Sequence, residues 1–194
     1  MAFVTAAPED ENRFAIAVTE AAMLSYRLAL LLMTTLAVPA WSAEHAHQHG
    51  VVSLNATLEG EVLSLDLDAP LDSLLGFERA PRTEAERAAA AALLKTLGPG
   101  TSMWRPNPEA RCVLAQAKVE APVLQQPQAP AGEHADLEAG YQFRCAQPAQ
   151  LTGLQHELFQ AFARLQRIEW QFALPSGQGK RTVKRPEALL PLKR

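Results

Sequence analysis

The residues best suited to chemistry are three closely spaced histidines, His45, His47 and His49. In an extended chain, residues two apart share a side and lie roughly 6.7 Å from one another. Imidazoles at that spacing can converge on one ion held about 2.0–2.1 Å from each nitrogen, which is the distance that zinc prefers. The spacing therefore predicts zinc binding. The alternative is a solvated tail that binds metal only as any His-rich tract does.

A second group of candidate ligands lies in the later half of the chain, where His134, Asp136 and Glu138 alternate with apolar residues. Such alternation predicts a strand with one polar face, which here would offer one imidazole and two carboxylates. We take His134 and Asp136 as candidate metal ligands. The alternative is that they are ordinary exposed strand residues.

Enzyme motifs are absent from the sequence. It contains no Gly-rich phosphate loop, no HExxH and no Gly-x-Ser-x-Gly, so we expect no catalysis. The formal net charge is −3, from 18 basic and 21 acidic residues. That balance gives no overall attraction for nucleic acid.

The chain contains two cysteines, Cys112 and Cys145. An even pair in an exported protein favours one disulfide over a thiolate metal site. Closing a loop of about 33 residues would stabilise the fold by roughly 3.5 kcal/mol in the chain-entropy model.

Export is indicated by residues 23–43, which combine a short basic start, an apolar stretch and a run of small residues. This order is typical of a signal peptide. The apolar stretch is far shorter than the roughly 20 residues that cross a bilayer, so we expect no membrane span. Residues 1–22 form an acidic prefix unsuited to a signal peptide. We therefore expect translation to start at Met23; the alternative is an unusually long n-region.

The position of signal cleavage decides which metal suits the tail. Cleavage after Ser42 would begin the chain with Ala43-Glu44-His45. Its free amine, two amides and imidazole could then surround Cu(II) or Ni(II) in a plane. Cleavage after Ala40 or Ala43 leaves the imidazoles for tetrahedral zinc, and we favour Ala43.

Beyond a His-rich tail at residues 44–50, the pattern predicts a single α+β domain over residues 51–194. Alternation on both sides of Glu59-Gly60 indicates an antiparallel hairpin. A capping box at Thr83 begins a helix that ends near Leu97, and we expect a second capped helix from Thr152 with His156 on its solvated face. Further alternating segments at 112–119, 137–143, 168–174 and 180–184 complete an antiparallel sheet of about six strands with two helices.

Several motifs together carry a family resemblance. They are His45-Ala46-His47-Gln48-His49-Gly50, Ala69-Pro70, Gly76-Phe77-Glu78-Arg79-Ala80-Pro81, Glu133-His134-Ala135-Asp136 and Tyr141-Gln142-Phe143-Arg144-Cys145. In order and spacing they resemble the periplasmic zinc-uptake proteins of the ZrgA type, over nearly all of residues 44–194. The resemblance implies a periplasmic, zinc-repressed accessory protein that binds zinc and passes it toward an ABC-type importer or its binding protein.

The chain departs from the family pattern in two places. Residues 125–132 contain no histidine where relatives carry a His-rich insertion, and Arg79 stands where relatives often have histidine. The remaining candidate ligands are the tail histidines and His134, with Asp136. They form one site only if the tail lies against the strand that carries His134. The alternative function is a metal-independent interaction domain of the cell envelope with incidental tail histidines.

Overall fold

The computed structural model describes residues 48–100, 102–125 and 135–193. All of them belong to one compact unit, Ala46–Arg194. The expected signal peptide, the expected start at Met23 and the tail residues before Gln48 lie outside the described residues. Within the described ranges, the helices are too short or too polar to cross a membrane.

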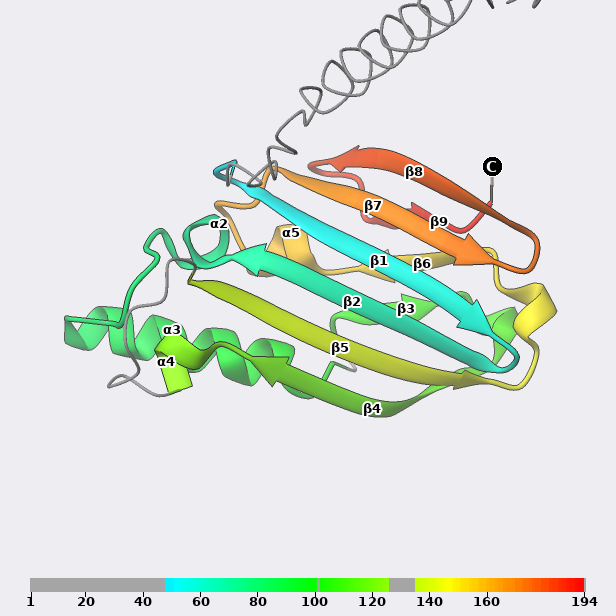
Figure 1. The fold of residues 1–194 in the computed structure, drawn as a ribbon, viewed down its shortest axis with the longest axis horizontal. Coiled ribbons are helices and arrows are strands. Elements are labelled where there is room, and N and C mark those ends of the chain that lie inside the picture. Colours follow the sequence, from blue (N-terminus) through cyan, green and yellow to red (C-terminus); the bar gives the residue numbers. More distant parts are fainter. Residues whose placement is uncertain (1–47, 101, 126–134, 194) are drawn as a thin grey trace, which may run out of the picture. The chain divides into compact units, whose positions relative to one another are not determined.

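A six-stranded sheet forms the body of the domain (Figure 1). Its hairpin joins β1 (Val51–Glu59) to β2 (Val62–Pro70), as the alternation predicts. The other strands are β4 (Cys112–Glu120), β5 (Asp136–Cys145), β7 (Arg167–Leu174) and β8 (Gly177–Lys184), in the order β4-β5-β2-β1-β7-β8. The predicted α+β class and six-stranded sheet are confirmed. One pair departs from the antiparallel expectation, because β7 runs parallel to β1.

A second, three-stranded sheet is built from short strands in the order β3-β6-β9. They are β3 (Trp104–Pro106), β6 (Gly153–His156) and β9 (Leu189–Pro191). The helix expected from Thr152 is therefore wrong, since β6 lies there and only the one-turn helix α5 (Leu158–Ala161) follows. Pairing with a strand on each side of β6 outweighs the local capping signal. His156 is accordingly buried rather than solvated.

The longest helix, α3 (Glu84–Leu97), begins with the predicted capping box. The Thr83 hydroxyl accepts from the Glu86 N–H at 3.1 Å, and Glu86 accepts from the Thr83 N–H at 3.2 Å. The other helices are short: α2 (Leu71–Leu75), α4 (Pro122–Gln125) and the 3-10 turns η1 (Pro108–Ala110) and η2 (Pro148–Gln150).

The core lies between one face of the large sheet and the elements that cover it, α3 and the small sheet. Tyr141 of β5 packs against Trp104 of β3 and donates to the carbonyl of Leu97 at the end of α3. Trp170 of β7 donates to the carbonyl of Pro191 in β9. At one end of β4 and β5, Cys112 stands opposite Cys145 and the predicted disulfide joins them. This excludes the thiolate metal site.

Candidate metal-binding end of the sheet

Three strand ends meet at one end of the large sheet, on the left of Figure 1. β1 begins there, β2 ends there and β5 begins there. Pro70 at the end of β2 pairs with Asp136 at the start of β5, and the N–H of Leu71 donates to the carbonyl of Ala135 at 3.1 Å. Helix α2 therefore begins directly beside the start of β5.

His49 contacts this helix. Its Nδ1 lies 2.5 Å from Oδ2 of Asp72, in the first turn of α2. The His49 side chain is 84% exposed, whereas that of Asp72 is only 17% exposed. A mostly buried carboxylate thus holds an imidazole that projects into solvent.

The backbone beside His49 is fixed from two sides. Ser73, fully buried on α2, donates to the carbonyl of Val51 at 2.9 Å and accepts from the Val51 N–H at 3.1 Å. Gly50 has a positive φ of 73°, a conformation that favours glycine. Its carbonyl accepts from the N–H of Gln166 at 2.8 Å. These bonds anchor the chain immediately after His49 to α2 and to the start of β7.

Arg164 contacts α2 at Asp72 and at Gly76, the residue that ends the helix. Its Nε donates to the Asp72 carbonyl at 3.3 Å, and its Nη2 lies 4.0 Å from Asp72 Oδ1. The guanidinium covers Gly76, where φ is 88° and a Cβ would meet Arg164 Cζ at 2.9 Å. Glycine at position 76 therefore lets Arg164 reach Asp72.

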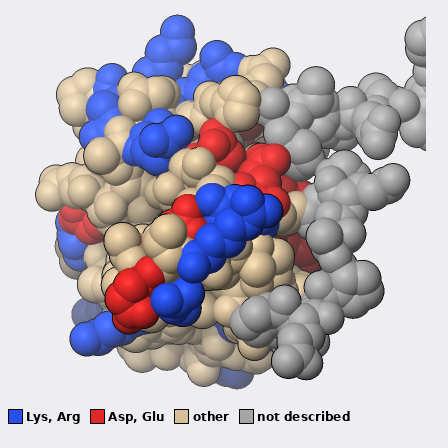
Figure 2. All heavy atoms as spheres, turned by 90° about the vertical axis from the view of Figure 1, so that its left-hand side faces the viewer, with Lys and Arg blue, Asp and Glu red and all other residues tan. Residues whose placement is uncertain are grey.

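Charged side chains of both signs gather on this end of the molecule (Figure 2). One pair is Arg79 with Glu86 at 2.7 Å, and Arg79 also lies over the ring of Phe77. The hydrogen bond from Arg79 is the largest influence that lowers the pKa of Glu86 to about 2. Arg79 thus joins the Gly76 loop to α3.

The structure describes two of the five predicted metal ligands, and both lie at this end. His49 precedes β1, and Asp136 begins β5 on the polar face that it shares with Glu138, as the alternation predicts. His45, His47 and His134 lie outside the described residues. Among the residues that are described, no three His, Cys, Asp or Glu side chains cluster so as to hold a metal.

Sequence reasoning missed Asp72, Ser73 and Arg164. Asp72 stands 23 positions from His49 and 92 from Arg164, so no local spacing connects them. The only available signal was an acidic residue in the first turn after a strand, and that signal alone predicts a helix start.

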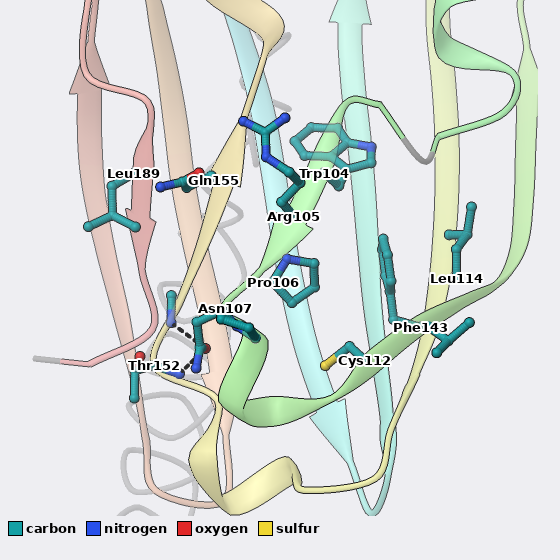
Figure 3. A pocket seen from close by; sticks show the side chains of 13 residues that line it. Trp104, Arg105, Pro106, Asn107, Cys112, Leu114, Phe143, Thr152, Gln155 and Leu189 are labelled. Atoms are coloured by element: carbon teal, nitrogen blue, oxygen red, sulfur yellow. Dashed lines mark hydrogen bonds between the residues drawn. The ribbon is translucent and has the colours of Figure 1, made fainter.

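A cavity of about 650 Å³ lies elsewhere, between the small sheet and the β4–β5 edge (Figure 3). Phe143 and Leu114 line it from the large sheet, and Trp104 and Pro106 line it from β3. Its lining includes Val113 and Leu189, the two large apolar side chains that are exposed in the described part of the chain. None of the described residues that line this cavity is His, Asp or Glu, so this lining offers neither the imidazole nor the carboxylate donors of a zinc site.

Comparison with known protein families finds a match over most of the chain. The model of a family described as ZrgA family zinc uptake protein matches residues 46–192. No curated protein matches the sequence. The match covers both sheets and the segment that contains His47 and His49.

Proposed function

Because the chain belongs to the ZrgA family of zinc uptake proteins, we propose that it is a periplasmic accessory protein that binds zinc and delivers it toward an importer. The family supports the role in zinc uptake. The observation that supports a binding site is that His49 and Asp136, both selected from the sequence as candidate ligands, lie at one end of the same sheet.

The proposed ligands are the tail histidines His45, His47 and His49, together with His134 and Asp136. Strands β1 and β5 are separated only by β2. At about 4.8 Å per strand, their ends are about 10 Å apart. His134 is bonded to Ala135, whose carbonyl accepts from the first residue of α2. Imidazole and carboxylate donors on these segments suit tetrahedral zinc.

Exposure of the His49 side chain supports delivery rather than permanent storage. The described ligand with the clearest geometry, His49, projects into solvent. Structural zinc sites are closed by four protein ligands, whereas an accessible site lets an incoming ligand join before the first ones leave. We therefore propose that zinc is cargo, transferred to an ABC-type importer or to its binding protein.

Calorimetry on the tag-free, mature protein tests zinc binding. We expect a dissociation constant tighter than about 0.1 mM, equivalent to more than about 5.5 kcal/mol. Replacing His45, His47 and His49 with asparagine should strongly weaken zinc binding. Glu44→Gln in the same tail serves as the control. Weaker binding by the wild type would refute specific zinc binding.

Growth under zinc limitation tests the cellular role. Deleting residues 44–49 should impair growth when zinc is scarce and should have no effect when zinc is supplied. A metal-independent envelope domain would tolerate the deletion in both media. Pull-down from periplasmic extract with and without zinc would identify the importer component.

A further inference from the structure

We propose that Asp72 is a positioning residue for zinc binding: it holds His49 in the tautomer protonated at Nδ1, so that Nε2 becomes the metal donor. This inference rests on the proposed function, because it assigns the geometry of one ligand in that site. Neither the residue nor its role follows from the spacing of the histidines.

The protonation state of His49 follows from its partner. A neutral imidazole carries one N–H and one acceptor nitrogen, and an ionised carboxylate only accepts. The hydrogen bond of 2.5 Å between His49 Nδ1 and Asp72 Oδ2 therefore requires the proton on Nδ1. The lone pair is then on Nε2, at the opposite edge of a ring that is 84% exposed.

Nδ1 and Oδ2 are joined by a hydrogen bond. Asp72 therefore acts through the His49 ring, and Nε2 on the opposite edge of that ring is left for the metal.

Asp72 is fixed in place before metal arrives. Its own carbonyl accepts from the Gly76 N–H at 2.9 Å and from Arg164 Nε at 3.3 Å. Its neighbour Ser73 ties α2 to the backbone of Val51, two residues beyond His49. Arg164 lies 4.0 Å from Oδ1 and leaves Oδ2 to His49. Carboxylates placed in this way orient histidine ligands, and their removal typically costs about 10–100-fold in metal affinity.

Zinc titration of Asp72→Asn by calorimetry is the first test. We expect about 10–100-fold weaker binding than in the wild type. Adding the substitution to His49→Ala should cause little further loss, because Asp72 acts through His49. Asp66→Asn removes the same charge from an exposed position on β2 and should leave the affinity nearly unchanged. An affinity of Asp72→Asn equal to the wild type would overturn the inference.

Long-range ¹H–¹⁵N correlation spectra of the His49 ring give a second test that does not depend on affinity. In metal-free wild-type protein at alkaline pH we expect a protonated Nδ1 and an unprotonated Nε2, and zinc should shift Nε2. A proton on Nε2, or zinc on Nδ1, would overturn the inference. If the wild type binds no zinc, the proposed function fails, while the metal-free spectrum still reports the tautomer that Asp72 imposes.

Discussion

His156 donates from Nε2 to the carbonyl of Glu187 at 3.1 Å, while its Nδ1 accepts from the N–H of Leu158 at 3.2 Å. Both ring nitrogens of the neutral imidazole therefore form hydrogen bonds. The residue is only 2% exposed. Protonation of Nδ1 would set its new N–H against the N–H of Leu158, and the hydrogen bond between them would be lost. The ring joins the β6–α5 turn to the segment before β9.

This arrangement predicts acid sensitivity of the fold. Burial is the largest influence on the pKa of His156, and it lowers that pKa below the ordinary value of 6.5. Its stabilising contribution is complete above about pH 6.5 and is lost as the pH falls below that value, by up to about 1.4 kcal/mol per pH unit. Urea unfolding of metal-free protein at several pH values measures this. A His156→Gln variant with the same pH slope as the wild type would contradict the assignment.

Removal of the Tyr141 hydroxyl should destabilise the domain. Burial raises the pKa of Tyr141 to about 12, so the phenol stays protonated and donates to the Leu97 carbonyl at 3.0 Å. Tyr141→Phe leaves that carbonyl without its donor, and we expect a loss of about 1–3 kcal/mol in the free energy of unfolding. The control is Gln142→Ala on the exposed face of β5, for which a change within about 0.5 kcal/mol is expected. Equal stabilities of the two variants would argue against this role.

The disulfide should also contribute measurably to the free energy of unfolding. Thiol titration of denatured, unreduced protein should detect no free thiol, because Cys112 and Cys145 are joined. Replacing both with alanine should lower the free energy of unfolding by roughly 3.5 kcal/mol, the chain-entropy value for a separation of 33 residues. Two thiols per unreduced chain would refute the bridge.

The mature N-terminus decides the metal preference of the tail. Intact mass of the exported protein should show that it begins at Glu44, which leaves the imidazoles for zinc. If the chain instead begins at Ala43, one equivalent of Cu(II) should give the visible absorption band of a square-planar nitrogen complex. That result would make zinc specificity of the tail wrong, and His134 would have to anchor any zinc site.

Local patterns predicted the elements whose signals are local. The hairpin of β1 and β2 follows from alternation around Gly60, and the start of α3 follows from Thr83 and Glu86. The helix predicted from Thr152 was wrong, because its capping signal is local whereas the strands that pair with this segment, β3 and β9, are distant in the chain.

The candidate site shows the same division. His49 and Asp136 were selected as candidate ligands from spacing and alternation, which are properties of neighbouring residues. Asp72 is brought to His49 by the pairing of β1 with β2 and by helix α2. The carboxylate that orients the ligand is therefore a product of the tertiary structure.

The parallel pairing of β1 with β7 has a kinetic consequence. Val51 in β1 pairs with Arg167 in β7. Strand β1 is therefore synthesised long before the strand that pairs with its second edge. Until then β1 can pair only with β2, and its other edge stays open to wrong partners. Because the pairing of β1 with β7 joins residues far apart in the sequence, the domain is expected to fold more slowly than a helical bundle. Truncation before β7 would leave the second edge of β1 unpaired, and an exposed edge of this kind favours aggregation.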